Sequence, residues 1–214
     1  KTYYHPSNSF IYLYGNMDMA EKLDWLDREY LSRYDRQPVD SAIASQEAFA
    51  SPVEKEIFYP ITDAESEEQA TYLSVNTVVG DDLDPALYMA FQILEYVLID
   101  APGAPLKEAL IGAGIGQDIM GGYENGILQP YFSVIAKNAS KEQKGEFLAV
   151  VKGTLRRLAD QGIGEKTLLA GINYYEFRYR EADFGNAPKG LMYGLQCLDS
   201  WLYDGDPFMH LAYE

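Results

Sequence analysis

The chain has 214 residues, of which 47% are hydrophobic and 23% charged, an ordinary globular composition that excludes a disordered or fibrous protein. Its 33 acidic and 17 basic residues give a formal net charge of −16, which argues against nucleic-acid and anionic-membrane binding because both need a basic surface. The single cysteine, Cys197, excludes an internal disulfide framework and fits a reducing compartment. The two histidines, His5 and His210, lie near opposite ends, so a histidine-based metal site would require the termini to meet.

The first segment resembles the end of a domain. Residues 7–15 (SNSFIYLYG) are an apolar, aromatic run of strand length, and residues 19–35 repeat apolar positions at helical spacing. A strand needs pairing partners, and nothing before residue 7 can supply them. With no initiator Met and no signal peptide, the chain is therefore expected to be cut from a longer one. If the missing partners are not replaced, the edge of residues 8–14 is expected to pair with another chain and give a concentration-dependent dimer.

Residues 36–69 differ in character from what surrounds them. Ala, Ser, Glu and Gln dominate, and only residues 56–61 (EIFYPI) indicate a short edge strand, whose pairing Pro60 limits. The net negative charge per residue is about twice as high before residue 70 as after it, and acidic residues are most concentrated at residues 63–68. We interpret this stretch as a solvated acidic linker.

The next segment begins with a strand and an apolar helix. Residues 70–79 alternate polar and apolar side chains, which predicts a half-buried strand. Asp84 followed by Pro85 predicts the start of a helix over about 85–100 that is apolar nearly all round. A short helix over 106–111 is expected to end at a glycine in the left-handed conformation, either Gly112 or Gly114.

A hairpin and three helices complete the pattern. Asn125-Gly126 predicts a tight type I′ turn, with the second strand over 127–136. Ser140 and Gln143 match a capping box for a helix to about residue 160, and further helices are expected over 165–183 and from Pro188 to about 203. This order predicts an α+β domain whose helices are layered on one face of a mostly antiparallel sheet. No segment reaches the ~18 apolar residues of a membrane span.

The residue patterns offer little catalytic chemistry. The glycine run 112–116 follows a helix rather than preceding one, so a helix end is favoured over a nucleotide loop. Two distant histidines disfavour Ser-His and Cys-His catalysis, and Cys197 is expected to be a buried helical residue. With 33 acidic residues, a catalytic carboxylate pair could be drawn from many positions, and the sequence favours none of them. The 18 tyrosines are expected to pack between layers, with a ligand-stacking surface as the alternative.

Three segments resemble one family when taken in order. Residues 8–34 (NSFIYLYGNMDMAEKLDWLDREYLSRY) are similar to the closing strand and helix of a domain in pitrilysin/insulinase-type zinc metallopeptidases. Residues 94–116 (LEYVLIDAPGAPLKEALIGAGIG) resemble the third domain of the presequence-protease branch. Residues 190–214 (GLMYGLQCLDSWLYDGDPFMHLAYE) resemble the helical connection that follows it.

The resemblance implies four homologous α+β roll domains that close around a peptide, with zinc bound only by a His-x-x-Glu-His motif in the first. The helix of this chain that corresponds to the zinc helix reads Gln92, Glu95 and Tyr96 where the motif has histidine, glutamate and histidine. Gln and Tyr cannot replace two imidazoles, so Glu95 is expected to be a structural remnant. The resemblance therefore predicts no catalytic, cofactor-binding or metal residues within this chain, and zinc ligands outside it.

The resemblance divides the chain into four parts. We expect the closing strand and helix of a second domain at 1–35, an acidic linker at 36–69, a non-catalytic third domain at 70–184 and a helical exit at 185–214. The expected function is the non-catalytic middle segment of a zinc endopeptidase that degrades peptides in a closed chamber, providing wall, scaffold and substrate binding. The alternatives are a catalytically inactive peptide-binding or assembly subunit of the same fold, and an unrelated enzyme with its site in the Tyr-rich helices.

The expected partners are peptides, for which the charge of −16 favours cationic ones, and the remaining domains of the same polypeptide. Nucleic acid and membrane are not expected. The expected location is the cytoplasm, or the mitochondrial matrix or another organelle in a eukaryote.

Overall fold

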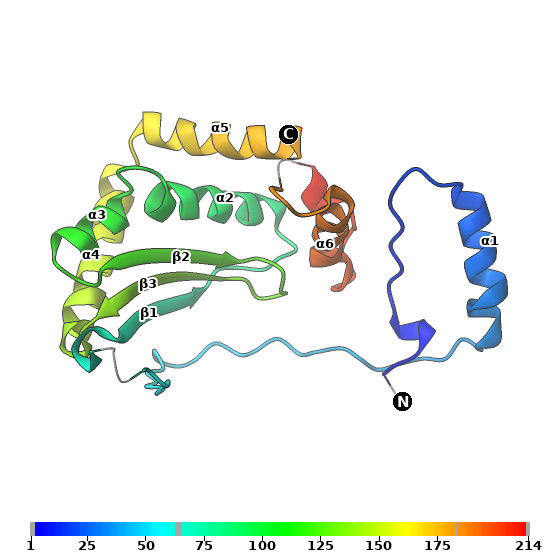
Figure 1. The fold of residues 1–214 in the computed structure, drawn as a ribbon, viewed down its shortest axis with the longest axis horizontal. Coiled ribbons are helices and arrows are strands. Elements are labelled where there is room, and N and C mark those ends of the chain that lie inside the picture. Colours follow the sequence, from blue (N-terminus) through cyan, green and yellow to red (C-terminus); the bar gives the residue numbers. More distant parts are fainter. Residues whose placement is uncertain (1–2, 63–65, 183, 213–214) are drawn as a thin grey trace.

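The computed structural model describes residues 3–62, 66–182 and 184–212, and its centre is an antiparallel sheet with the strand order β1-β3-β2 (Figure 1). The strands are β1 (Thr71–Val78), β2 (Asp118–Glu124) and β3 (Tyr131–Ala139). Val134 of β3 lies opposite Val75 on one side and Gly121 on the other. Since side chains alternate along a strand, this register places Leu73, Val75, Ile119, Val134 and Ala136 on one face. The predicted α+β class with a mostly antiparallel sheet is confirmed.

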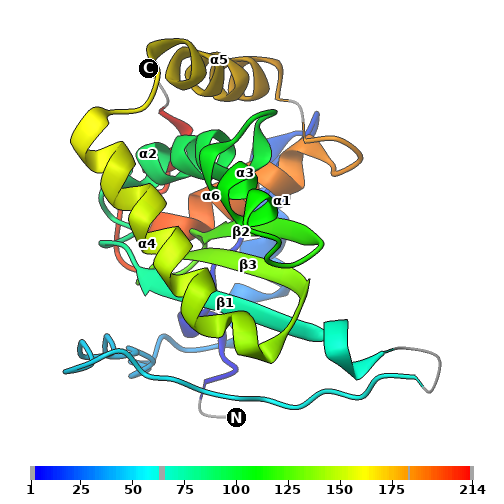
Figure 2. The ribbon, with the colours of Figure 1, turned by 90° about the vertical axis from the view of Figure 1, so that its left-hand side faces the viewer.

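Helices cover the apolar face of the sheet. Figure 1 shows α2 (Pro85–Glu95), α3 (Pro105–Gly112) and α5 (Glu165–Glu181) on the same side of the strands, with α5 outermost. In Figure 2, α4 (Lys144–Gln161) lies nearest the viewer, where it packs against α3 and β1. The main core is formed by side chains of the strands, α3, α4 and the turn after α2: Leu73, Leu98, Ile99, Leu106, Leu110, Ile115, Ile119, Val134, Ala136, Ala139, Phe147 and Val151.

The start of α2 follows its local sequence. The Asp84 side chain accepts hydrogen bonds from the backbone N–H groups of Ala86 and Leu87, and Pro85 occupies the first helical position, as predicted. The helix then widens into a π-helical turn, η4 (Tyr96–Asp100), which the Ala101 N–H closes by donating to the Tyr96 carbonyl at 2.7 Å. The expected helix over 85–100 is therefore helical throughout, with a wider last turn.

The signals around α3 and α4 are also confirmed. The chain leaves α3 through Gly114, whose φ of +69° is the left-handed conformation expected for the end of this helix. Ser140 and Gln143 form both hydrogen bonds of the capping box, first around the short 3-10 helix η5 (Lys141–Gln143) and then into α4. Local hydrogen bonds thus decide where these helices begin and end.

The connection between β2 and β3 differs from the prediction. A hairpin forms, but its loop spans residues 125–130, and neither Asn125 nor Gly126 has the positive φ of a type I′ turn. The loop carbonyls bind elsewhere: the Val79 N–H donates to Pro130 and the Asp82 N–H to Leu128. The β1–α2 connection therefore holds this loop open, and β3 begins at residue 131 rather than 127.

After the last two long helices, the C-terminal segment returns to α2. α5 approaches the π-helical turn closely, since a Cβ placed on Gly171 would lie 2.5 Å from Val97 Cγ2. α6 (Lys189–Trp201) follows, and the 3-10 helix η6 (Met209–Leu211) packs against both α6 and α2. The predicted helices over 165–183 and 188–203 are confirmed with slightly shorter bounds.

The N-terminal segment does not form the expected strand. After the 3-10 helix η1 (Pro6–Asn8), residues 9–14 have no strand partner within the described part of the chain, so the strand over 7–15 is a wrong prediction for this structure. Their aromatic side chains pack on α6 instead, with the Phe10 and Trp201 ring centroids 4.7 Å apart.

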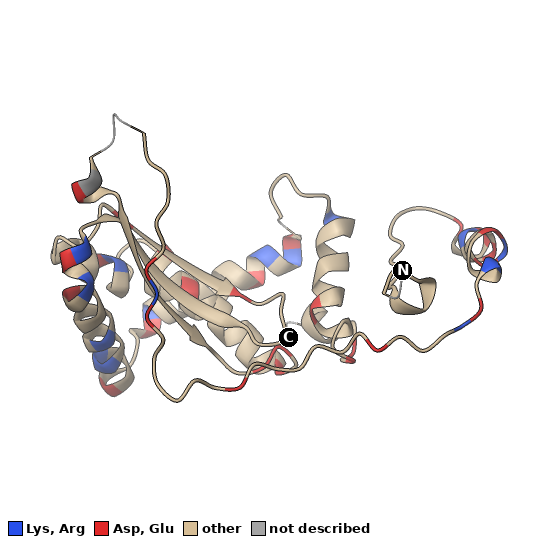
Figure 3. Cartoon of the chain, turned by 90° about the horizontal axis from the view of Figure 1, so that it is seen from below, with Lys and Arg blue, Asp and Glu red and all other residues tan. Residues whose placement is uncertain are grey.

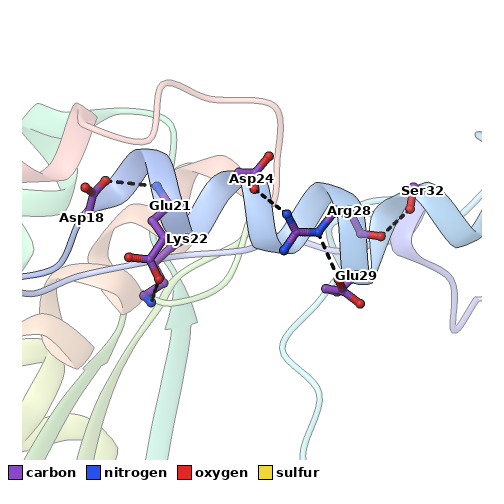
Figure 4. A network of polar contacts seen from close by, with 7 residues as sticks. All are labelled: Asp18, Glu21, Lys22, Asp24, Arg28, Glu29 and Ser32. Atoms are coloured by element: carbon purple, nitrogen blue, oxygen red, sulfur yellow. Dashed lines mark hydrogen bonds and ion pairs between the residues drawn. The ribbon is translucent and has the colours of Figure 1, made fainter.

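The helix that follows is shorter than predicted. α1 (Met19–Glu29) ends six residues before the expected end, and only a 3-10 turn, η2 (Leu31–Arg33), continues it. Figure 4 shows what holds α1: the Asp18 side chain caps the Glu21 N–H, and Arg28 bridges Asp24 and Glu29, both at 3.1 Å. None of its residues is buried, so local polar contacts hold this helix.

Residues 36–62 run as an extended segment beside the sheet (Figure 3). The edge strand expected over 56–61 is absent because this segment has no ladder partner there, and the Phe58 side chain is 88% exposed. Contacts are sparse, such as the Glu54–Lys144 ion pair at 2.6 Å. Residues 63–65 of the predicted acidic maximum lie outside the described residues, and a 3-10 helix, η3 (Glu67–Gln69), leads into β1. No helix in the described part of the chain is long and apolar enough to cross a membrane.

Candidate functional site

A cavity of about 400 Å³ lies where α2, α5, α6 and the β2–β3 loop meet. Its walls are partly aromatic, with Tyr88, Tyr175, Tyr179 and Phe184. Its charged side chains are Glu124, Arg178 and Asp199. A larger hollow of about 640 Å³ lies between η1, η2 and residues 36–39, with Arg36 as its charged side chain. Of these two cavities, the first gathers several titratable groups from distant parts of the chain.

Tyr88 and Asp199 form the inner wall of this cavity. The buried Tyr88 hydroxyl donates a hydrogen bond to Asp199 Oδ2 at 3.0 Å. Burial and the nearby Glu124 raise the pKa of Asp199 to about 6, although the Tyr88 hydrogen bond opposes this shift. Burial and the Asp199 charge raise the pKa of Tyr88, so its hydroxyl stays protonated. Asp199 is therefore mostly ionised at neutral pH and protonated in mild acid.

A second titratable pair lies behind Tyr88. The His210 ring stacks on the Tyr88 ring with centroids 3.8 Å apart, and His210 Nε2 lies 3.8 Å from Asp82 Oδ2. Both side chains are fully enclosed. Burial, helped by Asp199 and Asp81, raises the pKa of Asp82 to about 8, and burial lowers the pKa of His210. The pair is thus held mainly in its neutral form at pH 7, and the stacking of His210 on Tyr88 joins η6 to α2.

The three residues that correspond to the zinc motif make other contacts. Gln92 Oε1 accepts a hydrogen bond from the Tyr179 hydroxyl at 3.0 Å, and the Tyr96 ring stacks on Tyr174 with centroids 4.3 Å apart. Burial and Asp100 raise the pKa of Glu95 at the end of α2. Zinc is bound by several imidazole, thiolate or carboxylate groups. The amide of Gln92 and the phenol of Tyr96 are none of these. This donor set does not fit zinc.

Among the described residues, no three His, Cys, Asp or Glu side chains converge so that they could hold a metal ion. His5 accepts a hydrogen bond from the Ser7 N–H and packs its ring on Tyr34, so its neighbours differ from those of His210. Cys197 is buried in α6 as predicted, and burial raises the pKa of its thiol, which disfavours the reactive thiolate. That the chain has no catalytic, cofactor-binding or metal residues stays a prediction.

Sequence reasoning missed the residues that line the cavity. Asp82, two residues before the predicted helix cap Asp84, is fully buried behind Tyr88, outside the cavity wall, and no pattern in the sequence indicates this. Asp199 and Glu124 carry no motif, and only the fold brings them together. Tyr88 and Tyr175 lie buried between layers, as expected for packing, and both line the cavity together with Tyr179; a ligand-stacking surface stays the alternative prediction.

A three-stranded antiparallel sheet with helices on one face is the fold that the sequence resemblance to metallopeptidase domains implies. The family model described as the Peptidase M16 inactive domain matches residues 1–174, and the chain belongs to this family. The match is continuous across residues 35 and 69, where boundaries were predicted, and the four-part division stays a prediction.

Individual relatives agree with this assignment. Protein HypA of Clostridium perfringens is 44% identical over 214 residues, which are all of this chain and 22% of that protein. Presequence protease 1, chloroplastic/mitochondrial, of Arabidopsis thaliana is 32% identical over 217 positions, covering all of this chain and 20% of that protein. The chain thus spans about a fifth of the length of these curated relatives.

Solved structures support the fold. A crystal structure of an inactive peptidase domain from Bordetella parapertussis superimposes with a TM-score of 0.53 at 12% identity, over 65% of this chain and 73% of that one. At this identity the likeness shows the fold alone. The resemblance found in the sequence is confirmed for the family and the fold class.

Proposed function

We propose that the chain is a non-catalytic segment of a zinc-dependent endopeptidase that degrades peptides in a closed chamber, where it forms wall and scaffold and binds substrate. The observation that carries this proposal is the match of an inactive-domain family model over residues 1–174. The contacts of α2 support it, because Gln92 and Tyr96 are already bound to Tyr179 and Tyr174.

The roles of this chain follow from its charge and shape. Zinc, held by residues outside this chain, would supply the activated water. The residues described here would attract and hold the peptide. A net charge of −16 raises the local concentration of cationic peptides by long-range attraction, and this effect weakens as salt rises. Cytoplasmic location and the absence of nucleic-acid and membrane partners stay predictions; the relatives named presequence proteases are mitochondrial or chloroplastic by name.

The test uses the full-length protein that carries this chain. We expect it to cleave an unstructured peptide, to lose this activity when a chelator removes the metal, and to regain it with zinc. Glu95→Gln is expected to leave kcat within about twofold, because this half-buried carboxyl is proposed to be structural. A loss of kcat of a hundredfold or more with unchanged KM would contradict the proposal.

The same experiment separates the alternative of a catalytically inactive subunit. A full-length protein that binds the peptide but does not cleave it with zinc present would favour a peptide-binding or assembly role. In that case a metal assay should also find no stoichiometric zinc, because the motif would be absent or incomplete elsewhere in the polypeptide.

A further inference from the structure

We propose that the cavity between α2, α5, α6 and the β2–β3 loop binds the basic side chain of a peptide, with Glu124 and Asp199 as its anionic end. The inference rests on the proposed peptide-binding role and deepens it, because it names the kind of side chain that is bound and the place where it binds.

Two carboxylates converge at one end of the cavity. A Cβ placed on Gly126 would lie 3.5 Å from Asp199 Oδ1 and 3.7 Å from Glu124 Oε1, so both oxygens border the same small volume. The absence of a side chain at Gly126 leaves that volume open. The Tyr88 hydroxyl binds Asp199 Oδ2 and orients the carboxylate, which leaves Oδ1 directed at Gly126.

This anionic end has no cation of its own. Among the described residues, neither Glu124 nor Asp199 forms an ion pair. The two carboxylates repel each other instead, and this repulsion is one reason for the raised pKa of Asp199. The cavity also contains Arg178, which forms no ion pair with either carboxylate among the described residues. A ligand cation placed near Gly126 would relieve the repulsion.

The rest of the cavity suits a long aliphatic stem. Tyr88, Tyr175 and Tyr179 form the aromatic part of the wall, and Met192 and Leu195 provide apolar surface for methylene groups. A volume of about 400 Å³ exceeds what a bare ion needs, and two carboxylates without a third ligand are a poor metal site. These features favour a lysine or arginine side chain over a metal ion.

The test compares two peptides that differ in one charge. Binding to the full-length protein is measured in chelator, so that the peptide stays intact, with a peptide that contains one lysine and with its norleucine counterpart. We expect the lysine peptide to bind about tenfold more tightly at pH 7.5, and the preference to fall below pH 6, where Asp199 becomes protonated.

Two double variants of equal charge change locate the effect. Glu124→Gln with Asp199→Asn is expected to reduce the preference to about onefold, and an asparagine at 199 can still accept the Tyr88 hydrogen bond. The matched control, Glu146→Gln with Asp160→Asn, changes exposed carboxylates on α4 and is expected to keep the preference. An equal loss in both variants would show a long-range field rather than a site and would overturn the inference.

Other outcomes also decide the matter. A wild-type preference near onefold, a preference that survives in the Glu124/Asp199 variant, or free butylamine binding as tightly as the lysine peptide would each overturn the inference. Cleavage with zinc is measured separately. A protein that cleaves peptide but fails these binding tests contradicts the inference alone, and one that passes them without cleaving contradicts only the proposed peptidase role.

Discussion

Residues 3–62 and residues 71–212 contain similar kinds of apolar side chains but use them differently. None of residues 3–62 is buried, and Leu23 and Trp25 of α1 are more than half exposed. In the second region Leu106 and Phe147 are enclosed in a continuous core. Both regions nevertheless contain capped helices. Helix signals therefore act locally in both, whereas burial stabilises only the second.

The largest expected effect comes from two matched alanine substitutions, one in each region. Phe147→Ala, in the core, is expected to lower the free energy of opening of the β1–β3 amides by about 3–5 kcal/mol, because a cavity replaces a packed ring. Leu23→Ala on α1 is expected to change it by less than about 0.5 kcal/mol. Hydrogen exchange of the full-length protein measures both. Similar losses for the two variants would contradict the contrast between the regions.

A second pair compares a glycine inside the packed region with one between the regions. Gly171→Ala forces a methyl group against Val97 and is expected to cost about 1–3 kcal/mol in the opening of α5. The methyl group of Gly194→Ala would lie 2.8 Å from the Tyr12 ring, a partly exposed side chain that can move away.

Hydrogen exchange distinguishes the two outcomes. Gly194→Ala should increase exchange only in residues 9–14 and leave the core unchanged. As a control, Gly153→Ala on α4 has open space around it and is expected to stabilise its helix by about 0.5–1 kcal/mol. A core opened by Gly194→Ala would show that the two regions depend on each other.

The smallest effect is a pH dependence confined to the packed region. Asp82 has a folded pKa of about 8, above its unfolded value, so its contribution to stability is present at low pH and lost as the pH rises toward 8. His210 has a lowered pKa and acts in the opposite direction below about pH 6.5. The clean window is therefore pH 6.5–8, where stability should fall by about 1.5 kcal/mol.

Substitution separates this effect from general charge. Asp82→Asn should remove the slope, while Asp40→Asn, on the exposed segment, should keep it. Exchange rates corrected for their intrinsic pH dependence give the slope. An unchanged slope in Asp82→Asn would assign it to other groups.

The sequence predicts those features whose partners lie within a few residues. The Asp84 cap, the Ser140–Gln143 box and the left-handed Gly114 depend on hydrogen bonds or dihedral angles inside one turn, and all three are confirmed. The family is also visible in the sequence, because residues 8–34 and 94–116 keep its local motifs.

Features that depend on distant partners are not predictable in this way. Residues 9–14 have strand composition, yet a strand exists only where a neighbouring strand offers hydrogen bonds. Asn125-Gly126 is a turn signal that two hydrogen bonds from residues 79 and 82 override. The cavity combines α2, α5, α6 and a loop, and no spacing in the sequence places Glu124 beside Asp199.

The π-helical turn at residues 96–100 has a consequence for how relatives can vary. Its Val97 faces Gly171 of α5, while Ile99 faces Gly121 of β2. In each pair a branched side chain occupies the volume that a larger partner would need. Among relatives, side-chain size at positions 97 and 171 should vary in opposite directions, and the same holds for positions 99 and 121. A relative with alanine in place of either glycine should carry a smaller residue opposite it. The turn thereby limits the size of one residue on α5 and of one residue on β2.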